Sequence, residues 1–157
     1  MRRFLTGGMF FLGVMSLPVA LSPWQSSAAP RTDYRNDPRF HALRKFFHQG
    51  LCPAEHLSDV FLEAADAYAL DWRLLPSLSF VESTGGKAAR NNNMFGWNSG
   101  RTKFPSASAG IHAVGYNLAY ADAYRGKKLD SLLSTYNPNA DYARAVKSVM
   151  RSIAPTE

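Results

Sequence analysis

Apolar residues recur every three or four positions along most of the chain after residue 37, which is the period of amphipathic helices. We expect a short helix after Pro38. A longer helix is expected to begin at Pro53, because proline suits the first helical position. The apolar positions that define these two helices are Phe40, Leu43 and Phe47 in the first and Leu57, Val60, Phe61, Ala64 and Tyr68 in the second.

A third helix is expected to begin with Asp71 as its cap and to run through Glu82, although Pro76 in its second turn lacks a backbone donor. Glu82 follows Leu75 by seven residues and Leu78 by four, so helical geometry places all three on one apolar face. An unpaired ionised carboxylate is costly to bury, so such a group tends to keep its proton. We therefore predict that Glu82 points inward and can act as a general acid.

The segment after this helix has no regular period. Residues 83–86 have the composition of a helix end, and glycine, asparagine and proline dominate from there to Pro105. A structureless loop of this length is uncommon inside a compact domain unless it has a function. We expect this loop to form one wall of a cleft beside Glu82.

A fourth helix is expected after Ser106 or Ser108, either of which can cap it, and it should end near residues 125–126. Three tyrosines recur along it at a spacing of four, and they either pack between helices or form a platform on which sugars stack. These tyrosines are Tyr116, Tyr120 and Tyr124.

Two further segments complete the helical pattern. Residues 129–136 predict a short helix, the Asn-Pro-Asn run at 137–139 breaks it, and residues 141–153 predict a last amphipathic helix. No strand pattern or repeat is present. The predicted class is all-α, with an irregular loop lobe after the helix that carries Glu82.

The first 28 residues have the pattern of a secretory signal peptide. Arg2 and Arg3 precede an apolar run at residues 9–21, and small residues follow, with cleavage expected after Ala28. The apolar run has 13 residues, whereas a membrane-spanning helix needs about 20. We expect an exported protein, periplasmic or extracellular, with no stable membrane insertion after cleavage.

Cleavage would leave 129 residues (157 − 28), enough for one compact domain with its own core. We expect a linker and short helix at residues 29–52 and the main domain at residues 53–157. Losing Arg2 and Arg3 lowers the net charge from +6 to +4, which suits either ordinary solubility or attraction to anionic wall polymers. Cys52 is the only cysteine, so no intramolecular disulfide can form, and we expect it to be buried.

Other chemistries have little support in the sequence. The four histidines lack metal-ligand spacing with one another or with Cys52, and no glycine-rich phosphate loop follows a strand. Basic residues are not interleaved with aromatic residues, as binders of single-stranded nucleic acid require. We expect no metal, no cofactor and no nucleic-acid partner, and a monomeric protein.

Several motifs together resemble a known group of enzymes. The run Glu-Ser-Thr-Gly-Gly at residues 82–86, followed by Asn-Asn-Asn-Met-Phe-Gly-Trp at 91–97, resembles bacterial glucosaminidases and lytic transglycosylases with a lysozyme-like fold. The Tyr-Asn-Pro run at 136–138 resembles an element of lytic transglycosylases, and Tyr-Ala at 142–143 one of glucosaminidases. The resemblance covers roughly residues 57–153.

This resemblance implies a lysozyme-like helical domain that cleaves β-1,4 bonds between N-acetylmuramic acid and N-acetylglucosamine in peptidoglycan, without a cofactor. Glu82 would be the catalytic acid that protonates the glycosidic oxygen. The residues that the resemblance places against the glycan strand are Ser83, Asn93, Phe95, Gly96, Trp97, Tyr136, Asn137 and Tyr142.

The chain departs from the two-acid pattern of ordinary glycosidases, which place a second carboxylate about 5–10 Å from the acid. Residues 83–121 contain no Asp or Glu, and Asp122, Asp130 and Asp141 are expected at surface or capping positions. Lytic transglycosylases, in contrast, manage with one glutamate, and assistance by the N-acetyl group of the substrate is another route that needs one acid. The alternative function is a catalytically inactive module that binds glycans or assists wall assembly.

Overall fold

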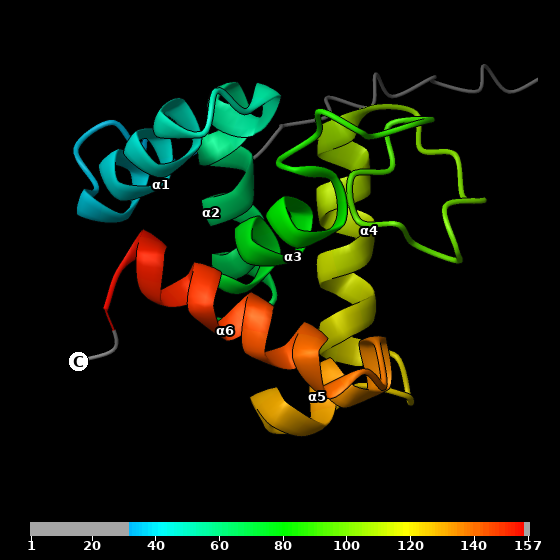
Figure 1. Ribbon diagram of the computed structural model, residues 1–157. Helices are drawn as coiled ribbons and strands as arrows, with labels where there is room; N and C mark the ends of the chain where they lie inside the picture. The colour runs from blue at the N-terminus through cyan, green and yellow to red at the C-terminus, as the bar shows by residue number, and fades with distance from the viewer. Residues whose placement is uncertain (1–31, 156–157) are drawn as a thin grey trace, which may run out of the picture. The chain divides into compact units, whose positions relative to one another are not determined.

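The computed structural model describes residues 32–155, so the predicted signal peptide lies outside the described residues. All regular elements in the described part are helices, apart from one isolated bridge between Arg90 and Asn93. The predicted all-α class is therefore confirmed. In order, the elements are α1 (Pro38–Gln49), the 3₁₀ helix η1 (Pro53–Leu57), α2 (Ser58–Ala67), α3 (Leu74–Ser83), α4 (Ala107–Tyr120), α5 (Leu129–Tyr136) and α6 (Ala140–Ile153) (Figure 1).

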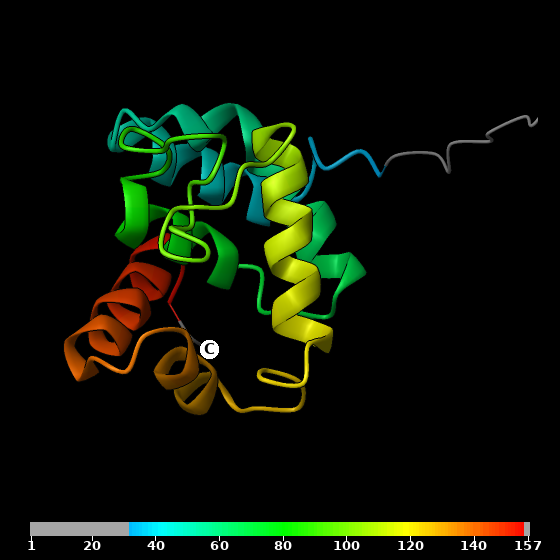
Figure 2. The ribbon, with the colours of Figure 1, turned by 90° about the vertical axis from the view of Figure 1, so that its right-hand side faces the viewer.

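The core forms around α3, which packs along α6, while α4 packs along α2 (Figure 1). The irregular segment at residues 84–106, the loop lobe, lies beside α4 and next to the end of α3 (Figure 2). Burying one large apolar side chain stabilises a fold by about 1.5–3 kcal/mol. Fully buried side chains from α1 to α6 share this single core, including Leu43, Phe47, Phe61, Leu78, Val114, Leu133 and Val146.

The helix predicted from Pro53 is two elements, η1 and α2. Its predicted apolar positions are buried, apart from the partly buried Tyr68. The break occurs at the fully buried Ser58, whose hydroxyl donates to the Glu55 carbonyl at 2.7 Å. This local bond supports the tighter 3₁₀ turn before the α-helix begins. Cys52, just before η1, is buried as predicted, and burial raises the pKa of its thiol.

Helix α3 begins at Leu74, so the prediction that Asp71 caps it was wrong. The Asp71 carboxylate accepts from the backbone N–H of Arg73 at 2.9 Å and from its guanidinium at 2.7 Å, which forms a turn before the helix. The later start places Pro76 in the first turn of α3. Backbone N–H groups there have no intrahelical acceptor, so proline costs no hydrogen bond.

Helix α4 is capped by Ser106, whose hydroxyl oxygen accepts from the backbone N–H of Ala109 at 3.1 Å. It ends at Tyr120, five residues before the predicted end near residue 125, because the chain becomes extended at Ala121 (φ −66°, ψ 141°). Beyond Leu118 the next residues are partly buried or exposed. A longer helix would therefore bury no further apolar face.

The last two helices follow the sequence prediction closely. Helix α5 occupies the predicted residues, and α6 begins one residue earlier than predicted. Asn139 caps α6, since its side-chain oxygen accepts from the backbone N–H of Asp141 at 2.9 Å. Across residues 32–155, no helix combines the length and the apolar character needed to cross a membrane.

Candidate active site

Glu82 lies in the last turn of α3, where the helix leaves the core. The helix ends at Ser83, and Thr84 takes up the left-handed conformation with φ 54°. Leu75 and Leu78 on the same face are buried, whereas Glu82 is partly buried. The helix end therefore presents the Glu82 carboxylate at the boundary between the core and the loop lobe.

Gly96 in the loop lobe covers one side of the Glu82 carboxylate. A Cβ atom at position 96 would lie 2.6 Å from Oε2 of Glu82, and Gly96 has φ +59°. Glycine adopts that backbone conformation at little cost and leaves room for the oxygen. A methyl group at residue 96 would therefore force the Glu82 carboxylate to move from its present position.

Hydrogen bonds from two buried polar side chains hold the loop lobe in place. The Asn93 side chain accepts from the Trp97 N–H at 2.9 Å and donates to the carbonyls of Trp97 and Thr102 at 3.0 and 3.1 Å. The Ser83 hydroxyl donates to the Met94 carbonyl at 2.8 Å. Both side chains are buried. Ser83 and Asn93, predicted as substrate contacts, lie within the fold and shape the wall of the site.

The loop lobe is tied to α5 through Tyr136. Its hydroxyl donates to the backbone carbonyl of Phe95 at 2.6 Å, and the Phe95 side chain is fully buried. The Tyr136 ring packs against Trp97 at 5.8 Å between centroids and stacks on Tyr142, also at 5.8 Å. Burial, with the nearby Glu82 charge, raises the pKa of Tyr136 far above its ordinary value. Phe95 thus contributes a buried anchor and a backbone acceptor.

Tyr142, near the start of α6, directs a buried hydroxyl toward Glu82. This hydroxyl has no hydrogen-bond partner of regular geometry among residues 32–155. Burial first, then Tyr136 and the neighbouring Glu82 carboxylate, raises the pKa of Tyr142 far above its ordinary value. The phenol therefore keeps its proton and remains available as a donor. Asn137, in contrast, closes the turn between α5 and α6 by accepting from the Asn139 N–H at 3.0 Å.

A hollow of about 510 Å³, here called the Trp97 hollow, opens beside Gly96. Its lining contains aromatic rings, hydroxyls and an amide, and no charged side chain. Gly96, Trp97 and Tyr136 were expected at the site, but nothing in the irregular sequence identified Asn98, Ser99 and Thr102. The residues that line it are Gly96, Trp97, Asn98, Ser99, Thr102, Tyr124 and Tyr136.

The predicted stripe of three tyrosines is divided by the early end of α4. Tyr124 lies beyond the helix and faces Trp97, with 6.1 Å between ring centroids. Tyr116 and Tyr120 instead contact the Tyr68 ring, at 6.1 and 6.2 Å, and they remain 56% and 48% exposed. Only Tyr124 of this stripe contributes to the Trp97 hollow.

No second carboxylate is available from the loop lobe. Asp122, Asp130 and Asp141 are exposed, and each forms an ion pair with a surface cation. Their partners are Arg125, Lys147 and Arg144, respectively. Among the described residues, no group of three or more His, Cys, Asp or Glu side chains is arranged to hold a metal ion.

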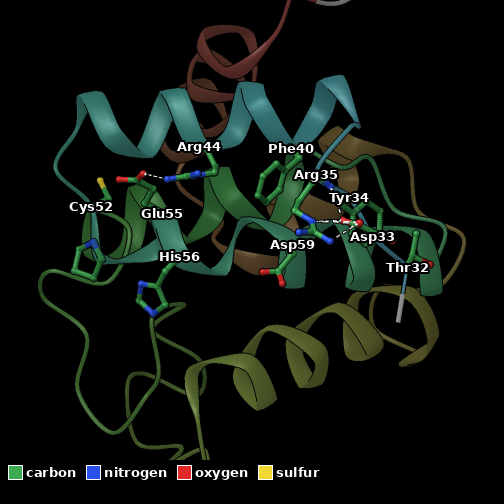
Figure 3. Close-up of a pocket in the computed structure, with 11 residues that line it drawn as sticks. Thr32, Asp33, Tyr34, Arg35, Phe40, Arg44, Cys52, Glu55, His56 and Asp59 are labelled. Atoms are coloured by element: carbon green, nitrogen blue, oxygen red, sulfur yellow. Dashed lines mark hydrogen bonds and ion pairs between the residues drawn. The ribbon is translucent and has the colours of Figure 1, made fainter. Parts of the chain in front are cut away.

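A larger hollow of about 730 Å³, the α1 hollow, lies between α1, η1 and residues 32–35 (Figure 3). Most of its charged side chains pair with one another, whereas Asp59 forms no ion pair within the described chain. Arg44 reaches from α1 to Glu55 in η1 at 2.8 Å, and Arg35 pairs with Asp33 at 2.9 Å. None of the residues predicted to act on substrate lines this hollow.

Comparisons with protein-family models, curated proteins and solved structures found no match to this chain. The geometry around Glu82 and the sequence motifs therefore carry the functional assignment.

Proposed function

We propose that this protein is an exported enzyme of lysozyme-like fold that cleaves β-1,4 bonds of peptidoglycan glycan strands, with Glu82 as the proton donor. One observation carries the proposal. The Glu82 carboxylate lies against Gly96, and Gly96 in turn lines the uncharged, aromatic Trp97 hollow. The Glu-Ser-Thr-Gly-Gly and Asn-Asn-x-Phe-Gly motifs, read from the sequence, support the same enzyme class.

The lining of the Trp97 hollow suits a sugar. Aromatic rings such as Trp97 and Tyr124 offer apolar faces on which the C–H side of a pyranose can stack. Asn98, Ser99 and Thr102 supply hydrogen-bonding groups for hydroxyl and acetamido substituents. A neutral polar ligand with apolar faces satisfies both sets of groups.

One carboxyl group can complete the reaction. Glu82 gives its proton to the glycosidic oxygen, the C1–O bond breaks, and Glu82 becomes a carboxylate that the Tyr142 hydroxyl can stabilise by donating a hydrogen bond. The carboxylate then accepts the proton of the sugar's C6 hydroxyl while that oxygen bonds to C1. The products are a free 4-hydroxyl end and a 1,6-anhydro end, and Glu82 regains its proton.

The lack of an acid between residues 83 and 121 also favours a second candidate, a glycan-binding or wall-assembly module without catalysis. Such a module would need the Trp97 hollow but no proton donor. The two candidates differ in what Glu82 does, so a substitution there separates them.

The test is to incubate the purified protein and Glu82→Gln with isolated sacculi and to analyse the released fragments by mass spectrometry. Losing a general acid lowers a rate by about 10²- to 10⁴-fold, and we expect a loss of that size. Glu55→Gln in the α1 hollow makes the same chemical change and should leave cleavage unchanged.

The fragment ends decide between enzyme classes. Anhydro ends identify a transglycosylase, whereas reducing N-acetylglucosamine or N-acetylmuramic acid ends identify the two hydrolase classes. If the protein and its Glu82→Gln variant both bind sacculi and neither releases fragments, the binding module is the correct function.

A further inference from the structure

The loop lobe has an unbalanced positive charge. Its four charged side chains are all basic and all exposed, and no ion pair within the described chain includes any of them. Elsewhere, cations such as Arg39, Arg44 and Arg73 pair with carboxylates. The basic residues of the loop lobe are Lys87, Arg90, Arg101 and Lys103.

Two of these cations flank the Trp97 hollow. Thr102 lines the hollow, and its chain neighbours Arg101 and Lys103 are exposed. The Arg101 side chain also contacts Asn98, another lining residue, at 3.3 Å to the carbonyl and 3.5 Å to the side-chain oxygen. The lining of the hollow is therefore uncharged, whereas its rim carries the Arg101 side chain, and Lys103 follows the lining residue Thr102 in the chain.

Lys87 and Arg90 lie on a different part of the loop lobe. Their neighbours Gly86 and Ala89 line a separate hollow of about 200 Å³ against η1. These two cations add to the positive field around the loop lobe, but they do not flank the residues that line the Trp97 hollow.

We propose that Arg101 and Lys103 bind free carboxylates of the peptides attached to the glycan strand, so that the substrate is peptide-bearing rather than bare glycan. This inference rests on the proposed function. An uncharged hollow suits the sugar ring, whereas cations at its rim suit anionic groups that extend from that ring. Unpaired surface cations attract such groups over about 10 Å at 0.1 M salt and over about 3 Å at 1 M.

The test measures binding of the purified Glu82→Gln protein to sacculi stripped of phosphate polymers, by co-sedimentation. A parallel sample has its peptide carboxylates converted to carboxamides. The rim variant is Arg101→Gln with Lys103→Gln. The matched control, Lys45→Gln with Arg151→Gln, removes two exposed charges from α1 and α6.

We expect the rim variant to bind untreated sacculi about threefold to tenfold more weakly, since an exposed ion pair contributes only about twofold to fivefold. The control should bind like the parent. On amidated sacculi the parent and the rim variant should bind equally weakly, and 1 M salt should remove the difference on untreated sacculi. Lys87→Gln with Arg90→Gln should have a smaller effect than the rim variant.

Several results would overturn the inference. One is equal binding of the parent and the rim variant to untreated sacculi, and another is an equal loss of binding in the control variant. A third is a loss of binding in the rim variant that persists on amidated sacculi. A fourth is binding that requires the phosphate polymers. Cleavage by the protein with Glu82 intact is measured separately on both kinds of sacculi. Equal cleavage of untreated and amidated sacculi disproves this inference alone. Charge-dependent binding without cleavage of either kind of sacculi disproves the proposed enzymatic function.

Discussion

Two hollows in the described part of the chain differ in how their polar groups are used. The α1 hollow is the larger, at about 730 Å³ against about 510 Å³, yet its acids and bases largely pair with each other. Next to Gly96 of the Trp97 hollow, Glu82 has no ion-pair partner in the described chain, and its charge acts on the buried Tyr142 hydroxyl. We therefore base the proposed site on a carboxylate without an ion pair, and not on the size of a hollow.

Apart from changes to Glu82 itself, the largest effect is expected from Gly96→Ala, which pushes a methyl group against Glu82. A displacement of about 1 Å at a reacting group can lower a rate about 100-fold, and we expect a loss of cleavage of at least that size. Gly100→Ala is the matched control, because Gly100 also has positive φ, +76°, but a Cβ atom there would meet nothing within 4 Å. Fragment release from sacculi measures both. Equal losses would show that backbone strain, and not contact with Glu82, is responsible.

Asn93→Ala should destabilise the wall of the Trp97 hollow and the whole protein. The change removes three hydrogen bonds in a buried setting, and we expect the free energy of unfolding to fall by about 2–4 kcal/mol. Asn92→Ala removes one bond, to the Phe104 carbonyl, and should cost about 1 kcal/mol. Urea denaturation measures both values. A cost for Asn93→Ala no larger than that for Asn92→Ala would contradict its role as the organiser of the loop.

Two Tyr→Phe changes distinguish a tyrosine that stabilises the wall of the Trp97 hollow from a tyrosine that assists the acid Glu82. Tyr136→Phe leaves the Phe95 carbonyl without this donor, so the free energy of unfolding should fall by about 1–2 kcal/mol. Tyr142→Phe removes a hydroxyl that lacks a regular partner, so stability should stay the same or rise, while cleavage should fall. Thermal unfolding and fragment release are measured on both variants. A clear loss of stability in Tyr142→Phe would mean that its hydroxyl holds the fold.

The smallest effect is expected in the α1 hollow. Arg44, and then His48, lowers the pKa of Glu55 below its ordinary value of 4.5. The folded state favours the ionised form of Glu55. The Glu55–Arg44 pair therefore stabilises the fold above pH 4.5, and this contribution is lost as the pH falls through the lowered pKa of Glu55. Glu55→Gln should therefore be slightly less stable than the parent at pH 7 and equally stable in acid, with unchanged cleavage. A loss of cleavage would make the α1 hollow part of the site.

The helices were predictable because their apolar residues keep a regular period, and Leu75, Leu78 and Val114 are buried as that period requires. The start of α3 was not predictable, because a salt bridge between Asp71 and Arg73 forms a turn that the apolar period does not reveal. Element boundaries depend on such local side-chain contacts, which compete with the general preferences of each residue.

The candidate site was partly predictable. The helical spacing placed Glu82 on the inner face, and the composition of the following segment indicated a functional loop. The contact between Gly96 and Glu82 depends on how that loop closes, which no spacing determines. Likewise, the α1 hollow is lined by the irregular residues 32–35 together with residues of α1 and η1, and residues 32–35 carry no pattern that would predict it.

The hydrogen bond from Tyr136 to the Phe95 carbonyl joins two walls that come from distant parts of the chain. Widening the gap between them would break that link and expose a buried acceptor. This link fixes the spacing of the two walls. If the proposed function is correct, we expect the protein to accept a single glycan strand more readily than a bulky, cross-linked one.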